Sequence, residues 1–215
     1  MLDLAHWQQI WQALDVSADE ALYHQLIKAY AQPQRHYHTQ QHLVECVEHY
    51  AHFQAHMSYP AEVALALWFH DAIYDVYAQD NELKSAEWAT RCMRQMGVNN
   101  ASITRVGQMI LATASHAPPS LSEDMQAVVV LQDQQILLDI DLAILAADAN
   151  RFVQYDQQIR AEYAWVPEQN YQTLRAQVLG GFLARERIYL TDMGYHLFES
   201  AARLNLQRAV SAIGA

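Results

Sequence analysis

The residue types best suited to hold a metal ion gather in the N-terminal part of the sequence. Histidine occurs 11 times in 215 residues, and eight of these histidines lie between His24 and His70. His38 and His42 stand four positions apart, so on a helix they share one face. His70 is followed directly by Asp71 at the end of the most apolar stretch of the chain. An ionisable pair in such surroundings is costly unless it is paired or bound to a metal.

Two further carboxylates stand in a similarly apolar setting downstream. Asp139 and Asp141 belong to the segment LLDIDLAIL, where a buried carboxylate needs a partner. Neighbouring side chains on a helix point about 100° apart. His70 and Asp71 therefore reach one cation only if it lies against their helix and takes further ligands from other helices. A metal ion shared by histidines and aspartates of several helices is the chemistry that this pattern predicts.

Helical periodicity runs through the whole chain and defines the elements that must position these residues. Leu4, Trp7, Ile10 and Trp11, for example, recur at three and four residues and form one apolar stripe. Six glycines and five prolines are fewer turn residues than an all-β protein of 215 residues needs, so an all-α fold is predicted. The helix over 61–74 is apolar nearly all round and should be central and buried. Two helices are expected before Pro33, and later ones at about 39–57, 83–96, 102–114, 121–138, 151–165, 167–190 and 195–210.

Composition and charge narrow the possible functions. Of the residues, 52% are apolar and 17% are charged, which favours a folded core in one domain. Thirteen basic and 24 acidic residues give a net charge of −11, so neither a nucleic-acid polymer nor an anionic membrane is an expected partner. No apolar run is long enough to span a membrane, and the start of the chain does not resemble a secretory signal. Cys46 and Cys92 match no zinc-ligand spacing and are expected in the core of a cytoplasmic protein.

Several segments of the chain together resemble the metal-dependent HD superfamily, named for its His-Asp dipeptide. More narrowly, they resemble a bacterial group of predicted HD-superfamily phosphohydrolases. The resemblance implies one all-helical HD-type domain over 1–215, with a motif core at about 34–146 and additional helices at about 150–212 packed on it. The segments of the motif core are RHYHTQQH (35–42), WFHDAIYD (68–75), DNELKSAE (80–87), LATASH (111–116) and LDIDLAIL (138–145). The C-terminal segments are IRAEYAWVP (159–167), RAQVLGGFLARERIYLT (175–191) and ESAARLNL (199–206).

The resemblance also implies a set of metal ligands. YHTQQH is similar to the YHxxxH motif of helical cyclic-nucleotide phosphodiesterases, whose second histidine binds metal, and this makes His42 the first ligand. His70 and Asp71 form the dipeptide, and Asp141 is the last ligand. Asp139 stays the alternative to Asp141, because the position two after Asp141 lacks the leucine of the HD signature. Imidazole and carboxylate ligands suit Mn²⁺, Fe²⁺, Co²⁺, Ni²⁺ or Mg²⁺, so a divalent metal ion is the expected cofactor.

Residues near this ligand set are candidates for acid–base work. His38 lies one helical turn before His42 and could protonate a leaving oxygen or hold a phosphate. Asp75, four residues after the second residue of the dipeptide, could orient a water or join a second metal site. Glu82 and His116 are further candidates for this outer set. For Glu82 the alternative is a capping carboxylate at the start of a helix.

Arginines supply the cations that a phosphate substrate requires. The chain has eleven arginines and two lysines, and arginine forms bidentate contacts with phosphate. Arg35 precedes the first motif, and Arg160, Arg175 and Arg185 lie in the C-terminal segments of the resemblance. Each is a candidate substrate-binding residue, with an ion pair inside the protein as the alternative role.

These observations converge on metal-dependent hydrolysis. We expect the protein to hydrolyse a phosphate ester or anhydride of a small molecule, in particular a nucleotide, by attack of a metal-activated water on phosphorus. A di-iron oxygenase of the HD type is the first alternative, with His116 or Glu82 as additional ligands. The second alternative is a non-catalytic HD domain that senses a metal or a nucleotide. The sequence leaves the substrate and the oligomeric state open.

Overall fold

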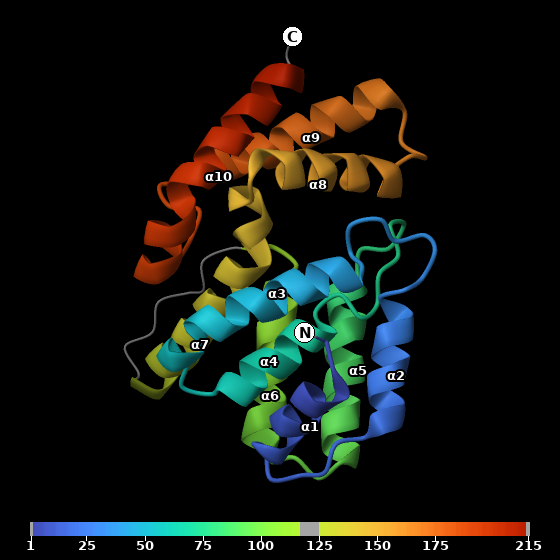
Figure 1. The fold of residues 1–215 in the computed structure, drawn as a ribbon, viewed down its shortest axis with the longest axis vertical. Helices are drawn as coiled ribbons and strands as arrows, with labels where there is room; N and C mark the ends of the chain where they lie inside the picture. The colour runs from blue at the N-terminus through green and yellow to red at the C-terminus, as the bar shows by residue number, and fades with distance from the viewer. Residues whose placement is uncertain (1, 117–124, 214–215) are drawn as a thin grey trace. The chain divides into compact units, whose positions relative to one another are not determined.

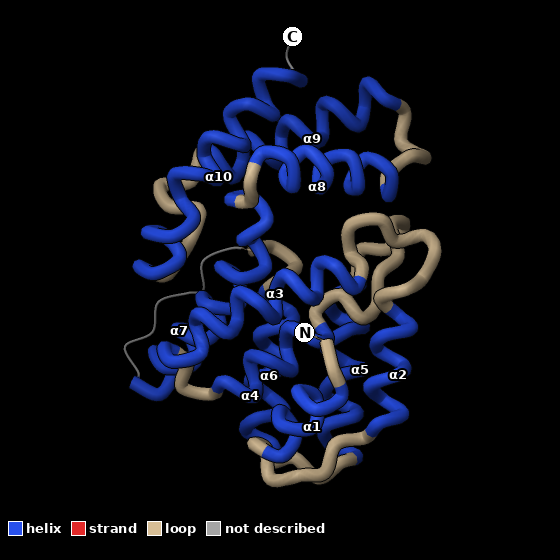
Figure 2. The backbone as a smooth tube through the Cα atoms, viewed as in Figure 1, coloured by secondary structure: helices blue, strands red, loops and turns tan. Residues whose placement is uncertain are grey.

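The structure, a computed structural model, describes residues 2–116 and 125–213 of the chain, with side chains from 130 onward in the second range (Figure 1). Over these residues it contains α-helices and short 3-10 helices, and no strand (Figure 2). The all-α prediction is confirmed. The first part of the helix expected at 121–138 lies outside the described residues. Among the described helices, none combines the length and apolar character needed to cross a membrane.

The chain divides into two compact units, Met1–Asp141 and Leu142–Ala215. The expectation of a single domain stays a prediction. Unit 1 contains α1 (Leu4–Gln12), α2 (Glu20–Ala29), α3 (Gln40–Phe53), η1 (Gln54–His56), α4 (Pro60–Phe69), α5 (Asn81–Gln95), α6 (Asn100–Ala112) and α7 (Met125–Asp141). Unit 2 contains η2 (Leu142–Ala146), α8 (Ala149–Glu162), α9 (Glu168–Leu183) and α10 (Asp192–Ile213).

Helix α4 is the buried centre of unit 1. Every residue from Glu62 to Phe69 is buried, and the helix packs against α1, α3, α5, α6 and α7. This confirms the prediction of a central apolar helix. The helix ends at Phe69, however, and does not continue to Tyr74 as its pattern suggested. The reason is tertiary, because the backbone N–H of Asp71 donates to the Tyr30 hydroxyl and that of Ile73 donates to Ser85 Oγ, instead of to carbonyls one turn earlier in α4.

Two polar anchors fix the start of α4 against its neighbours. The Asp133 carboxylate on α7 accepts the backbone N–H groups of Ser58 and Tyr59, at 2.9 and 2.7 Å. On the helix itself, the buried Glu62 carboxylate accepts from Arg105 of α6, with 2.6 Å between Nε and Oε2. Unsatisfied N–H groups at a helix start are costly when buried, so these contacts hold α4 in one position between α6 and α7.

Unit 2 is organised around the carboxylate of Glu199 on α10. This buried group accepts the backbone N–H groups of Ile188 and Tyr189 and is paired with Arg203. Arg203 in turn donates to the backbone carbonyls of Leu183 and Arg185. These contacts explain why α9 ends at Leu183, seven residues before the predicted end at 190, since the segment that follows is held by α10.

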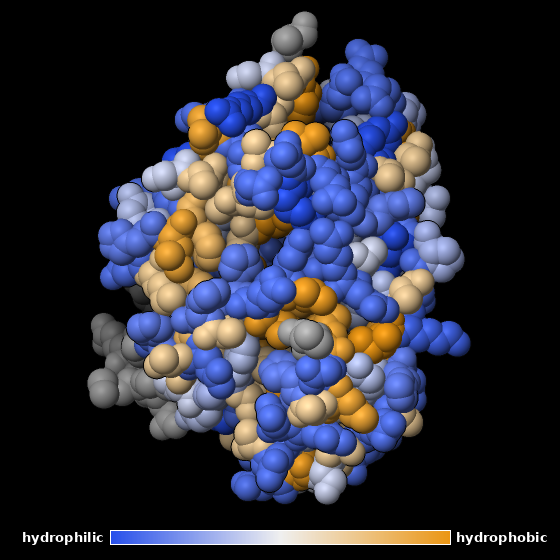
Figure 3. Space-filling model, viewed as in Figure 1, coloured by the Kyte–Doolittle hydropathy of each residue, from blue (hydrophilic) through white to orange (hydrophobic). Residues whose placement is uncertain are grey.

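On the face drawn in Figure 3, hydrophilic side chains predominate, and apolar ones occur between them in smaller groups. Exposed apolar side chains on unit 2 include Leu174 and Val178 of α9 and Leu197 and Leu204 of α10. Single exposed apolar residues are normal on folded proteins and carry no conclusion about partners.

Candidate metal centre

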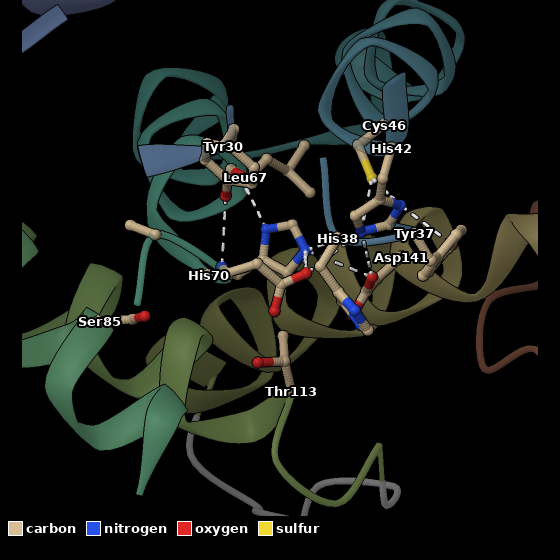
Figure 4. A network of polar contacts seen from close by, with 12 residues as sticks. Tyr30, Tyr37, His38, His42, Cys46, Leu67, His70, Ser85, Thr113 and Asp141 are labelled. Carbon is tan, nitrogen blue, oxygen red and sulfur yellow. Dashed lines mark hydrogen bonds and ion pairs between the residues drawn. The ribbon is translucent and has the colours of Figure 1, made fainter. Parts of the chain in front are cut away.

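Four side chains from three helix ends converge inside unit 1 (Figure 4). His42 lies in the first turn of α3, which begins after Thr39, whose side chain accepts from the backbone N–H of Gln41. His70 caps the C-terminus of α4, and Asp71 follows it. Asp141 is the last residue of α7. The exposed fractions of these side chains are 3% for His42, 1% for His70, 15% for Asp71 and 9% for Asp141.

The facing atoms of these side chains lie at the spacing of ligands around one ion. The two Nε2 atoms of His42 and His70 are 3.0 Å apart. Asp141 Oδ1 lies 3.2 Å from His42 Nε2 and 3.4 Å from His70 Nε2, and Asp71 Oδ2 lies 3.5 and 3.1 Å from the same atoms. Ligands about 2.1 Å from an ion are about 3.0 Å apart in octahedral geometry and about 3.4 Å apart in tetrahedral geometry. The residues present therefore fit a divalent ion.

The other ring nitrogens have partners that suit metal binding. His70 Nδ1 lies 2.7 Å from the carbonyl oxygen of Leu67, which can only accept, so Nδ1 carries the proton and Nε2 is left to bind. His42 Nδ1 lies 3.0 Å from the hydroxyl of the buried Tyr37, which can donate or accept. A metal ion on His42 Nε2 requires that Nδ1–H donate to the Tyr37 oxygen.

Electrostatics within the cluster favour charged forms in spite of burial. Burial by itself would lower the pKa of His42, but Cys46, Tyr37 and hydrogen bonds to the two aspartates hold it well above its usual value. Burial likewise opposes charge on His70, but the same aspartates hold its pKa well above the usual value. The imidazoles thus share protons with the carboxylates, and a divalent cation that binds here must displace those protons.

The aspartates show the complementary effect. Burial would raise the pKa of Asp71 and of Asp141, but the field of His70 and further imidazole contacts lower both well below the usual value. Asp139, the alternative ligand in the sequence, is fully buried on the same helix, but the carboxylate oxygens beside the histidines belong to Asp141. The geometry therefore favours Asp141.

The side chain of Arg35 holds the backbone at the His-Asp dipeptide. It is 4% exposed, and its guanidinium donates to the backbone carbonyls of Asp71 at 2.6 Å and Ala72 at 2.9 Å. It also donates to the carbonyl of His38 at 3.1 Å. Tyr30 adds a second support, because its hydroxyl donates to the carbonyl of Trp68 and accepts from the N–H of Asp71. These contacts engage Arg35 with the backbone that carries the ligands, and its expected role in substrate binding stays a prediction.

Two further histidines lie beside the cluster. His38 is half-buried, stacks on the Tyr74 ring with 4.0 Å between centroids, and lowers the pKa of Asp71 by its charge. In Figure 4 it lies between His70 and Asp141. His116 Nε2 lies 2.8 Å from Asp141 Oδ2, the oxygen that does not face His42. The roles expected of these two histidines at the site stay predictions.

Asp75 and Glu82 lie outside the buried cluster. The exposed Asp75 accepts the backbone N–H of Tyr77 at 2.9 Å, and its own backbone is bonded to Asn81. Glu82 lies in the first turn of α5, where a carboxylate favours the helix dipole. Neither belongs to the buried group of metal-binding side chains found in the part of the chain that the structure describes. Their roles at the site stay predictions.

The three C-terminal arginines have partners within unit 2. Arg160 donates to Glu168 at 2.9 Å and to two backbone carbonyls. Arg175 is buried and donates to Asp156 at 2.9 Å. Arg185 packs on the Phe182 ring, with 4.6 Å from its guanidinium carbon to the ring centroid. A substrate-binding role for these arginines stays a prediction.

Cys46 is a cluster member that the sequence interpretation missed. It is buried, as expected, but its Sγ lies 3.7 Å from both ring nitrogens of His42. With His42, His70 and Asp141 it forms a buried group whose possible ligand atoms all lie within 4.8 Å of one another. The signal was present in the four-residue spacing from His42, the same spacing that singled out His38.

No family model, curated protein or solved structure matches this chain. The molecule itself is an all-helical protein in which a buried cluster of histidine, cysteine and aspartate could bind a metal ion.

Proposed function

We propose that this protein is a metal-dependent phosphohydrolase of the HD type that acts on a small phosphorylated molecule, in particular a nucleotide. The observation that carries the proposal is the convergence of His42, His70, Asp71 and Asp141 at ligand spacing. A protein core that serves only stability does not need four ionisable side chains directed at one point, because burying them is costly. The order of these residues in the chain, with the motifs around them, supports the HD assignment.

A divalent ion held by these four side chains would neutralise charge on a phosphate and lower the pKa of a bound water. The protein residues around it have separate tasks. His38, which is half-buried and lies beside the His42 ring, would give a proton to a leaving oxygen or hold a phosphate oxygen. His116 orients Asp141 through its Oδ2, and Arg35 fixes the backbone of the dipeptide. These contacts keep the site in place without taking part in bond breaking.

The test begins with metal analysis of protein purified without chelator. The same protein is then screened with phosphomonoesters, phosphodiesters and nucleoside triphosphates in the presence of Mn²⁺, Co²⁺, Ni²⁺ or Mg²⁺. We expect release of phosphate or pyrophosphate, or cleavage of a diester, that a His70→Ala variant loses. His38→Ala should keep the metal and lose turnover by about a hundredfold. The exposed His36, two residues away, provides the matched control, and His36→Ala should keep both.

A second candidate function is a di-iron oxygenase of the HD type. The observation that favours it is the extra imidazole of His116, 2.8 Å from Asp141, because a second iron needs additional ligands. Two irons per chain with oxygen consumption would select this function. Tight metal or nucleotide binding with no turnover in the whole screen would select a sensor and contradict hydrolysis.

A further inference from the structure

Cys46 belongs both to the buried core of unit 1 and to the buried group of possible metal ligands. Cys46 follows His42 by one turn of α3, and its side chain is 1% exposed. Its sulfur is directed at the imidazole, with 3.7 Å to Nδ1 and 3.7 Å to Nε2 (Figure 4). The Nε2 atom is the one that faces His70 and Asp141. The thiol therefore lies beside the ring of one proposed ligand, equally far from its two nitrogens.

The spacing is close to that of sulfur and nitrogen ligands on one ion. With bonds of about 2.3 Å to sulfur and about 2.1 Å to nitrogen, the two ligand atoms are about 3.1 Å apart in octahedral and about 3.6 Å apart in tetrahedral geometry. Five protein ligands exclude a tetrahedral ion, so the observed 3.7 Å between Cys46 Sγ and His42 Nε2 is about 0.6 Å longer than the octahedral value. Because the sulfur is equally far from Nδ1 and Nε2, the Cys46 side chain must rotate toward Nε2 to join the ligand set.

We propose that Cys46 is a thiolate ligand of this centre, so that the site takes a borderline-soft divalent ion such as Zn²⁺ or Co²⁺ in preference to Mg²⁺. Thiolates select softer ions, whereas Mg²⁺ requires oxygen ligands. When the ion binds, the Cys46 S–H bond breaks, a sulfur–metal bond forms, and the proton leaves to solvent without any change of oxidation state. The inference rests on the proposed metal centre and adds a ligand to it.

Cobalt reports directly on this ligand. We would titrate Co²⁺ into metal-free protein and record two signals, the visible bands of the bound ion and the near-ultraviolet charge-transfer band of a cobalt–thiolate bond. The wild-type protein should show both signals. Cys46→Ser should keep the visible bands, lose the near-ultraviolet band and bind Co²⁺ at least about tenfold more weakly, while its Mn²⁺ affinity falls by less.

The second cysteine provides a control that leaves the cluster intact. Cys92 on α5 is half-buried, and in Cys92→Ser the only remaining thiol is that of Cys46. A charge-transfer band in Cys92→Ser must therefore come from Cys46, even if Cys46→Ser fails to fold. Visible cobalt bands without a charge-transfer band in the Cys92→Ser protein would overturn the proposal and leave the His and Asp centre standing. Absence of any Co²⁺ binding would overturn both.

Discussion

The two units each bury a group of charged side chains, but the groups are built differently. In unit 2, the Glu199 carboxylate meets only donors, namely two backbone N–H groups and Arg203. In unit 1, His42 and His70 direct their Nε2 atoms at each other at 3.0 Å, with two carboxylates beside them. The first group is complete as it stands. The second presents several electron-pair donors to a common point.

The comparison shows which buried charges indicate a function. Glu62 and Arg105 within unit 1 resemble the Glu199 group, because a carboxylate and a guanidinium satisfy each other. Such pairs fix helices and need nothing from outside. A cluster whose members are mostly potential ligands requires shared protons or a cation. Burial alone therefore does not identify the centre, whereas the nature of the facing atoms does.

The largest expected effect distinguishes the two aspartates of α7. Asp141→Asn should abolish stoichiometric metal binding, because an amide oxygen is a far weaker ligand than a carboxylate. Asp139→Asn, at a fully buried position two residues away, should keep the metal. Elemental analysis of both variants, with circular dichroism to confirm that each is folded, makes the measurement. Equal metal content in the two variants would show that the centre is misassigned.

Mutation of the Glu199 group in unit 2 should lower stability and leave metal binding unchanged. Glu199→Ala leaves two buried N–H groups without an acceptor, which should lower the free energy of unfolding by about 3 kcal/mol. Metal content per folded chain should not change. Denaturant titration measures the first quantity, and Glu186→Ala, at an exposed position, is the control. A loss of metal in the Glu199→Ala protein would remove the distinction between the two groups.

Chelation should affect the protein through the unit 1 cluster. An ion that binds only the folded state stabilises it by about 2.7 kcal/mol when its free concentration is a hundredfold above the dissociation constant. Removal of the metal should therefore lower the melting temperature, and metal addition should restore it. The Asp141→Asn variant should show no such response. An unchanged melting curve after verified removal of metal from wild-type protein contradicts the prediction.

Much of the fold could be predicted from the sequence, because its signal is local. The apolar residues of α4 and the spacing of the apolar stripes predicted an all-helical protein and its buried centre. The ligand group was predicted from the resemblance of ordered motifs. The predicted ends of α4 and α9 were wrong, since they depend on contacts from residues far away in the chain, such as Tyr30, 41 residues before Asp71. No periodicity encodes such a contact.

The backbone contacts of Arg35 and the approach of Cys46 to His42 could not be predicted, for related reasons. An arginine beside a histidine motif suggests an anion ligand, and only the folded chain shows that backbone carbonyls take its donors. A lone cysteine on an apolar helix face is usually a core residue, and its approach to His42 depends on the rotamers of both side chains. Sequence patterns identify residue types and faces, whereas these roles depend on the partner that each atom meets.

A smaller effect is expected from the partner of His42 Nδ1. Tyr37→Phe removes the oxygen that accepts Nδ1–H when Nε2 binds metal, and loss of such a partner costs about tenfold in metal affinity, or about 1.4 kcal/mol. Tyr50→Phe is the matched control, because this buried hydroxyl on α3 donates to the Pro60 carbonyl. Competition with a chelator measures both affinities. Equal affinity in the two variants would show that Tyr37 does not orient the imidazole.

The last prediction concerns alkaline pH and the support of the His-Asp segment. Burial raises the pKa of Tyr30 to about 12, from a value of 10.0 in the unfolded chain. The folded state thus holds this proton more tightly, so the contribution of Tyr30 to stability is complete below pH 10 and is lost as the pH rises through 12. Between pH 7 and pH 11 the loss of stability from this one group is about 1.4 kcal/mol.

The Tyr30→Phe variant tests this pH dependence. It should be less stable than wild type at pH 7, because the bonds of the hydroxyl to Trp68 and Asp71 are gone. Between pH 7 and pH 11, however, its free energy of unfolding should fall by about 1.4 kcal/mol less than that of wild type. Tyr77→Phe, at a position 70% exposed, should follow the wild-type curve. Denaturant titrations at the two pH values measure the change in the free energy of unfolding. Equal changes in wild type and Tyr30→Phe would mean that the Tyr30 hydroxyl is open to solvent.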